Sequence, residues 1–208
     1  MNEYEAKAWL TNTLHVSRET LERLDQLREL VIAESALQNL VSAATIPHFW
    51  TRHIVDSAQL LSLAAEAQPG AWLDLGTGAG FPGMVIALLS ERPIILVESR
   101  RKRFEFLREM ALALNLQHVS VHGGRLEIFE TRSVSVISAR AFAPLPKLLD
   151  LASRFSRNET LWLLPKGQSA QDELALIDKT WHGKFHVNRS ITDENAAILV
   201  AEGVSRRK

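Results

Sequence analysis

The spacing of apolar residues divides the chain into two parts of different character. Up to about residue 68 it is helical, because apolar side chains recur at intervals of three and four along residues 21–31. Ser17 stands where the N-cap of that helix is expected, and a further helical stretch is predicted over residues 46–67. We therefore expect residues 1–68 to form a helical N-terminal extension that packs on the rest of the chain.

After Pro69-Gly70, short apolar runs alternate with longer amphipathic segments. The runs predict strands at residues 71–75, 94–97, 119–122, 134–137, 161–164, 184–191 and 197–201. Helical spacing between them predicts helices over residues 81–89, 102–114, 145–155 and 170–179. This alternation indicates βαβ units, and hence an α/β domain over residues 69–208 with a mostly parallel, seven-stranded sheet. A turn around residues 193–195 makes the last two strands a hairpin, so we expect the last strand to be antiparallel.

The composition removes several classes of protein. The 208 residues include no cysteine, which excludes a disulfide scaffold, a thiolate zinc site, an iron–sulfur cluster and a cysteine nucleophile. No run of about 18 uncharged apolar residues occurs, and the acidic start lacks the order of a secretory signal. We therefore expect a cytoplasmic protein without membrane contact, and a monomer.

Charge is balanced, with 24 Lys and Arg against 24 Asp and Glu. This argues against non-specific coating of nucleic acid, which needs a large excess of cations, but leaves room for a small basic patch. The densest basic run, Arg100 to Arg103, stands at the start of a predicted helix, where cations oppose the helix dipole. That local cost favours contact with phosphate by Arg100, Arg101 and Arg103 over a merely solvated helix face.

A glycine-rich loop carries the most specific signal. Gly76, Gly78 and Gly80 directly follow a buried strand, so the backbone can turn sharply and approach a ligand without an intervening Cβ. Pro82 suits the first turn of the helix that follows. Glu98 ends the next strand, where a carboxylate can accept both hydroxyls of a ribose. Together these features predict a nucleoside-binding site at the carboxyl edge of the sheet.

The register of the loop selects the cofactor. A G-x-G-x-x-G pattern exists at Gly78, Gly80 and Gly83, but it starts two residues too late for a dinucleotide fold. Asp74, inside the strand before the loop, is instead typical of sites for S-adenosylmethionine. Two other interpretations stay open, a dehydrogenase and a glycine-rich turn without a ligand in which Asp74 is a local cap.

Residues and motifs that the sequence lacks restrict which atom could accept a methyl group. Methylation of pyrimidine carbon-5 needs a cysteine, and exocyclic adenine nitrogens usually need an Asn/Asp-Pro-Pro-aromatic loop, which residues 137–144 do not provide. A ring nitrogen with a free lone pair, such as guanine N7, has no proton to lose and needs mainly positioning. Arg140 and Lys166 stand at predicted strand ends near the cofactor, and such cations are common donors to guanine O6 and N7. The alternative for each is a salt-bridged or solvated cation.

A smaller polar group lies on the second helical stretch of the N-terminal extension. Arg52 and His53 stand one helical turn from Asp56. Either His53 and Asp56 bond each other and pin this helix over the site, or they meet the substrate. No second histidine has ligand spacing nearby, so we expect no metal site.

Four motifs in this order resemble one family. They are Arg52-His53-Ile54-Val55-Asp56-Ser57, the loop from Asp74 to Gly83, Ile137-Ser138-Ala139-Arg140-Ala141, and Pro165-Lys166-Gly167-Gln168. The chain is similar over nearly its whole length to the glucose-inhibited division protein B family, the bacterial small-subunit ribosomal RNA (guanine-N7) methyltransferases G. The resemblance implies a class I S-adenosylmethionine-dependent methyltransferase fold, Rossmann-like, acting on N7 of a guanine in 16S ribosomal RNA or the 30S subunit.

The residue pattern and the resemblance together assign residues, with Gly76, Phe81, Leu126, Glu127 and Arg140 carried over from the family. Asp74, Gly76, Gly78, Phe81, Glu98, Leu126, Glu127 and Arg140 would hold the cofactor, with Leu126 and Glu127 flanking its adenine. Arg52, His53, Arg100, Arg101, Arg103 and Lys166 would contact RNA, and no side chain need act as a base. The alternatives are a methyltransferase acting on another RNA, a protein or a small molecule, and a non-catalytic RNA-binding module.

Overall fold

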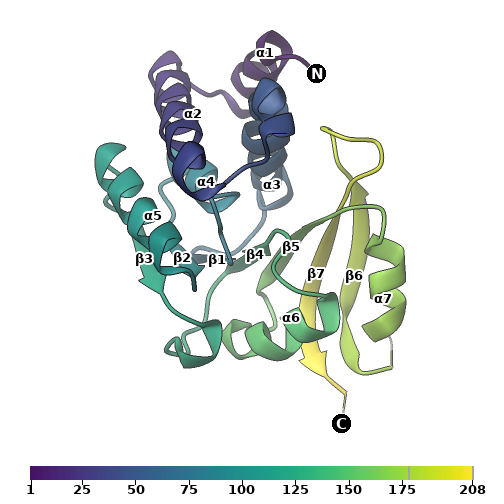
Figure 1. Ribbon diagram of the computed structural model, residues 1–208. Helices are drawn as coiled ribbons and strands as arrows, with labels where there is room; N and C mark the ends of the chain where they lie inside the picture. Colours follow the sequence, from purple (N-terminus) through teal and green to yellow (C-terminus); the bar gives the residue numbers. More distant parts are fainter. Residues whose placement is uncertain (178, 208) are drawn as a thin grey trace.

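A seven-stranded sheet carries the fold, in the strand order β3-β2-β1-β4-β5-β7-β6 (Figure 1). The structure is a computed structural model that describes residues 1–177 and 179–207. The strands within those residues are β1 (Trp72–Leu75), β2 (Ile94–Glu98), β3 (Val119–Gly123), β4 (Val136–Ala139), β5 (Leu161–Lys166), β6 (Trp181–Arg189) and β7 (Ala197–Arg206).

The direction of the strands fixes where a site can form. β1 pairs in parallel with β2 and β4, and the parallel order continues to β3 on one side and β5 on the other. β7 runs antiparallel between β5 and β6. The prediction of a mostly parallel sheet with an antiparallel last strand is confirmed. Because parallel strands end at the same edge, the loops after β1, β2, β4 and β5 meet there.

Helices cover both faces of the sheet. They are α1 (Glu3–Leu14), α2 (Arg18–Gln38), α3 (Asp56–Leu63), α4 (Gly83–Leu89), α5 (Arg101–Ala113), α6 (Leu145–Ala152) and α7 (Ala170–Ile177). One apolar cluster joins α1, α2 and α3 to α4, α5 and one face of the sheet. A second cluster joins the other face to α6, with α7 beside it (Figure 1). Of the predicted helix 170–179, residue 178 lies outside the described residues.

The N-terminal helices share their core with the sheet. Leu10, Leu27 and Val31 are fully buried and belong to the same cluster as Met84 of α4 and Leu107 of α5. Burying such side chains contributes about 1.5–3 kcal/mol each, so the shared core stabilises this segment against the sheet domain. The boundary at residue 68 stays an interpretation.

The helical stretch predicted over residues 46–67 is present up to Leu63, but it is built from three helices of different type. The structure has a 3-10 helix η1 (Ala43–His48), a π-helix η2 (Trp50–Val55) and only then α3. Pro47 lies inside η1 and has no N–H to donate to a regular α-helix. The π turn accommodates an extra residue and changes the direction of its side chains, and such turns are frequent at functional sites. Arg52 and His53 lie within it.

No helix among the described residues is long and apolar enough to cross a membrane.

Candidate functional site

The loop after β1 has the backbone shape that the glycines predict. Gly76, Gly78 and Gly80 have φ angles of 61°, 61° and 100°, which side-chain-bearing residues rarely adopt. A Cβ on Gly78 would meet Arg103 Nη1 at 3.7 Å and Gly76 O at 3.8 Å, which are ordinary van der Waals distances. The loop therefore forms a tightly turned backbone cradle beside the start of α5.

Asp74 holds this loop from inside the protein. Its side chain is fully buried, and its carboxylate accepts hydrogen bonds from Gly83 N (3.0 Å) and Ser138 Oγ (2.7 Å). Burial raises the pKa of Asp74 to about 6, although these hydrogen bonds favour the ionised form. Asp74 thus ties the start of α4 to β4, and in this arrangement it supports the cradle from beneath.

Glu98 faces the cradle from the end of β2. Its carboxylate accepts hydrogen bonds from Gly78 N (3.0 Å) and Arg100 N (2.8 Å), so it joins the loop to the start of α5. The backbone carbonyl of Glu98 accepts a bond from Gly124 N, which brings the following turn, η3 (Leu126–Ile128), to the same edge. Leu126 is buried and Glu127 exposed. The predicted cofactor residues are therefore gathered around one edge of the sheet.

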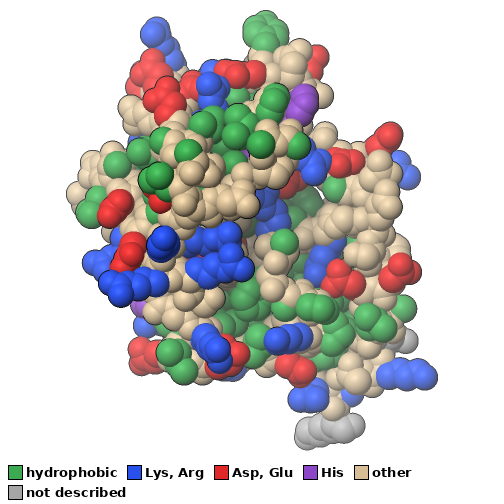
Figure 2. Space-filling view, viewed as in Figure 1, with side chains coloured by type: hydrophobic (Ala, Val, Ile, Leu, Met, Phe, Trp, Pro, Cys, Tyr) green, Lys and Arg blue, Asp and Glu red, His purple; other side chains and the backbone are tan. Residues whose placement is uncertain are grey.

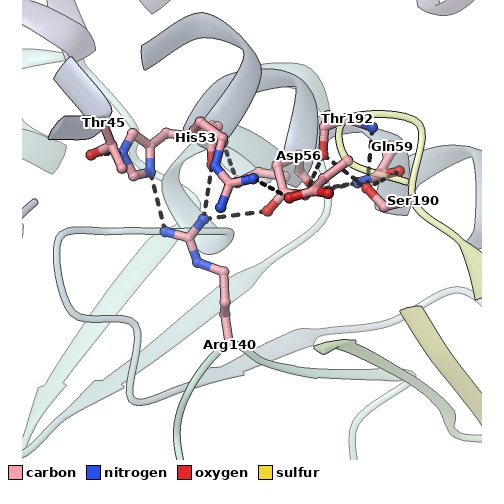
Figure 3. Close-up of polar contacts among 10 residues, drawn as sticks. Thr45, His53, Asp56, Gln59, Arg140, Ser190 and Thr192 are labelled. Atoms are coloured by element: carbon pink, nitrogen blue, oxygen red, sulfur yellow. Dashed lines mark hydrogen bonds and ion pairs between the residues drawn. The ribbon is translucent and has the colours of Figure 1, made fainter. Parts of the chain in front are cut away.

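Arg140 leaves the end of β4 and reaches the N-terminal segment (Figure 3). Its Nη1 lies 3.4 Å from Asp56 Oδ2 and 3.3 Å from the Arg52 carbonyl, and its Nη2 lies 3.5 Å from His53 Nδ1. The guanidinium carbon also lies 5.3 Å from the centre of the Phe81 ring. Each of these polar contacts is long, so the guanidinium is positioned without a short hydrogen bond.

His53 is a buried, neutral imidazole. Its ring stacks on Phe81 with centroids 5.0 Å apart, and its Nε2 lies 3.1 Å from Thr45 Oγ1. Burial, followed by the nearby charges of Arg140 and Arg52, lowers the pKa of His53 to about 3. The interpretation in which His53 and Asp56 bond each other was wrong, because Arg140 lies between them.

A cavity of about 1080 Å³ opens at this edge of the sheet. Its lining includes Arg52, Asp56, Arg140, Phe142, Lys166 and Asp193. Lys166 Nζ lies 2.8 Å from Glu173 Oε2, and Arg52 Nη1 lies 2.7 Å from Asp193 Oδ2. The salt-bridged alternative considered for Lys166 is thus the one observed, with its ammonium still on the cavity wall.

The basic run gathers over the start of α5. Figure 2 shows Lys and Arg side chains clustered on the face that Figure 1 presents, over α5. Arg100 and Arg101 are exposed, and Arg101 Nε pairs with Glu105 Oε1 at 2.8 Å. Since α5 has no acidic residue in its first turn and no side-chain cap, this concentration of cations is electrostatically unfavourable for the helix itself.

Comparison with known sequences decides the family. A family model described as GidB, rRNA small subunit methyltransferase G, matches residues 20–197. The chain belongs to this family. The ribosomal RNA small subunit methyltransferase G of Novosphingobium aromaticivorans is 54% identical over 202 residues, which cover 96% of this chain and 88% of that protein. The protein of the same name from Rhizorhabdus wittichii is 52% identical over 209 residues, covering 100% and 95%.

Solved structures agree on the fold. The O-methyltransferase from Bacillus cereus in complex with SAH superposes with a TM-score of 0.59 at 16% identity, covering 94% of this chain and 96% of that one. At this identity the likeness concerns architecture. The class I methyltransferase fold implied by the sequence resemblance is confirmed, with helices α1 to α3 added at its N-terminus.

Family membership leaves open which contacts hold the site together, and the sequence analysis did not identify Gln59, Ile191 or Thr192 as part of it. Asp56 Oδ1 accepts hydrogen bonds from Gln59 Nε2 (3.0 Å) and Thr192 Oγ1 (2.9 Å), and Gln59 Oε1 accepts one from Ile191 N (3.0 Å). This network docks the β6–β7 loop onto the N-terminal segment (Figure 3). Ile191 and Thr192 stand more than 130 residues from the side chains that they bond, so no local pattern could have identified these contacts.

Metal ligation finds no support in the described part of the chain, which contains no group of three or more His, Cys, Asp or Glu side chains able to hold an ion.

Proposed function

We propose that this protein transfers the methyl group of S-adenosylmethionine to N7 of a guanine in 16S ribosomal RNA. The observation that carries the proposal is that the cradle adjoins the cavity. A Cβ on Gly76 would lie 2.5 Å from Phe142 Cδ2, and Phe142 lines the cavity together with Arg140 and Lys166. A methyl donor on the loop and an acceptor in the cavity would therefore be neighbours.

The residues around the cradle suit S-adenosylmethionine. At Gly78 the ligand would meet backbone with no Cβ in the way, and Glu98 could exchange its bond to Gly78 N for bonds to the ribose hydroxyls. Leu126 and Glu127 would flank the adenine. Arg140 would face the cofactor, and the buried Phe81 would pack behind Arg140 instead of touching the cofactor. Asp74 would keep the loop in shape. When bound, this cofactor supplies an electrophilic methyl group on a sulfonium.

The cavity suits an acceptor that needs positioning and no base. Guanine N7 has a free lone pair and no proton to remove, and His53 is already engaged by Thr45 and Arg140. Arg140 and Lys166 would donate to guanine O6 or to phosphate, and holding the two reactants together supplies much of the rate. Arg52, Arg100, Arg101 and Arg103 would contact the surrounding RNA. The predicted RNA contact of His53 does not fit its burial, and His53 would act only by positioning Arg140.

The names of the relatives support a ribosomal substrate, the rRNA of the small subunit. The proposal implies a cytoplasmic enzyme, since ribosomal subunits are assembled there, and we expect it to act as a monomer. Sedimentation of the purified protein tests the oligomeric state.

The decisive experiment maps N7-methylguanine. Small subunits from cells that lack this protein are incubated with the purified enzyme and S-adenosylmethionine, and the 16S RNA is then cleaved at N7-methylguanine by borohydride and aniline. We expect one cleavage site that is present in wild-type cells, absent without the gene and restored by the enzyme. If every such site persists in the cells without the gene, the guanine-N7 assignment fails.

The remaining alternatives separate by binding. A dehydrogenase would bind NAD in competition with S-adenosylmethionine, and a non-catalytic RNA-binding module would bind RNA but not the cofactor. A methyltransferase with another RNA, a protein or a small molecule as substrate would bind the cofactor yet leave 16S RNA unmodified.

A further inference from the structure

The loop after β4 brings an aromatic ring against the cofactor cradle. Ala141 has a φ of 52°, in the left-handed region that residues with a side chain seldom occupy. This turn directs Phe142 back onto Gly76, close enough that only glycine fits at position 76. Backbone strain of this kind persists where the surrounding structure requires it, often at a functional site.

Phe142 is also part of the cavity wall. It is half-buried, packs on the apolar cluster beneath α6, and lines the cavity beside Arg140 and Lys166. Its neighbours along the chain, Ala141 and Ala143, are small. Hence the ring, in contact with the cradle, gives an apolar surface to a cavity wall that also carries two hydrogen-bond donors.

We propose that Phe142 is the stacking surface for the acceptor base. This inference rests on the proposed function and extends it to a residue that contacts the guanine. Proteins that recognise unpaired RNA bases commonly stack them on aromatic side chains, with hydrogen bonds read at the edges of the base. A guanine stacked on Phe142 would lie next to Gly76 and within the same cavity as Arg140. The aromatic ring would then set the plane of the base, and hydrogen bonds from the cations would orient its edge.

A purely structural role makes different predictions. If Phe142 serves only to pack on Gly76, Phe142→Leu, which keeps an apolar side chain, should retain activity, and losses should follow weakened cofactor binding. If the ring stacks the base, Phe142→Leu should lower kcat/KM on 30S subunits by about 10-fold or more at unchanged S-adenosylmethionine affinity. Phe142→Tyr should then retain activity, because it keeps the aromatic face.

Phe185 supplies the matched control. It is a half-buried phenylalanine on β6 that packs on the same cluster outside the cavity. Phe185→Leu should leave kcat/KM and cofactor affinity close to those of the wild type. Thermal unfolding of all three variants shows whether each is folded under the assay conditions.

A direct measurement uses guanosine monophosphate as the probe, with the enzyme saturated with S-adenosylhomocysteine. Stacking predicts an upfield NMR shift of the guanine H8 resonance with wild type and Phe142→Tyr, and its loss with Phe142→Leu. A shift that persists in Phe142→Leu, or wild-type kcat/KM in that variant, overturns the proposal. If the shift depends on Phe142 but the wild-type enzyme leaves 16S RNA unmethylated, the proposed function fails and the stacking surface stands.

Discussion

The guanidinium of Arg140 lies 3.4 Å from the carboxylate of Asp56, a residue 84 positions earlier in the chain. This ion pair joins the end of β4 to the start of α3, and the same carboxylate holds Thr192 of the β6–β7 loop. Three segments distant in sequence therefore converge on Asp56. The ion pair sets the position of the arginine that we propose to contact cofactor or guanine.

Replacing Asp56 by Asn should loosen this junction. The amide keeps one acceptor but removes the charge that pairs with Arg140, so the free energy of unfolding should fall by about 1–3 kcal/mol in urea titrations. Methylation should fall as well, because Arg140 is released. Asp150→Asn is the control, since its pair with Arg206 is exposed and should contribute under about 1 kcal/mol. Equal losses for both variants would contradict this role of Asp56.

Gly76→Ala should abolish cofactor binding. The new Cβ would clash with Phe142 at 2.5 Å in a backbone with φ of 61°. Gly203→Ala is the control for backbone strain without a clash, because Gly203 has a φ of 62° but its Cβ would have no contact shorter than 3.5 Å. We expect calorimetry to show no S-adenosylmethionine binding for the first variant and wild-type affinity for the second. Retained affinity in Gly76→Ala would refute the assignment of this loop.

Reversing two charges on α5 should weaken RNA binding through its salt dependence. For Arg100→Glu/Arg101→Glu, we expect weaker binding of 30S subunits and a slope of log affinity against log salt that is shallower by about 0.7–0.9 per lost phosphate contact. Arg18→Glu changes a similarly exposed cation on α2 and should have no such effect. Unchanged salt dependence and unchanged methylation of 30S subunits by the double variant would mean that Arg100 and Arg101 do not contact the RNA.

Asp193→Asn should strengthen RNA binding. Arg52 is held by Asp193 at 2.7 Å at the cavity, so an incoming phosphate must displace this carboxylate. A half-exposed ion pair contributes about 0.2–1 kcal/mol, which corresponds to a gain in affinity of up to about fivefold. The gain should vanish in Asp193→Asn/Arg52→Gln. If the double variant gains equally, Arg52 is not the responsible cation.

His53 should make stability fall in mild acid. Its pKa is about 3 in the folded protein, against an ordinary value of 6.5, so between these values the unfolded chain binds a proton that the folded protein excludes. The free energy of unfolding should therefore decrease as pH falls below 6.5, by up to about 1.4 kcal/mol per pH unit. Asp74, whose pKa is raised to about 6, acts in the opposite sense.

The variant His53→Gln separates the two groups, because Asp74 is unchanged in it. The free energy of unfolding is measured in urea from pH 7 to 4. As the pH falls, the wild type should lose unfolding free energy relative to the variant. A difference that stays constant with pH would mean that His53 titrates normally in the folded protein.

Local pattern was sufficient for the elements that depend on nearest neighbours along the chain. The buried runs, the helical spacing of α5 and the glycine loop could each be identified, because strand burial, helix periodicity and left-handed backbone are properties of short segments. The change of helix type within residues 46–67 could not be predicted, since a π turn has no simple apolar period. The cofactor contact of Leu126 and Glu127 stays a prediction that rests on the family resemblance, and no spacing rule pointed to these residues.

The sequence by itself determined the α/β fold, the glycine-rich loop after β1 with Glu98 at the end of the neighbouring strand, and the kinds of side chain available for chemistry. Only the tertiary structure decided which of them meet. Lys166 pairs with Glu173, Arg52 with Asp193, and Arg140 lies between His53 and Asp56. The reason is physical: a strand or loop motif depends on dihedral preferences and burial over a few residues, whereas an ion pair across the cavity depends on how the N-terminal helices and the β6–β7 hairpin pack on the same edge of the sheet.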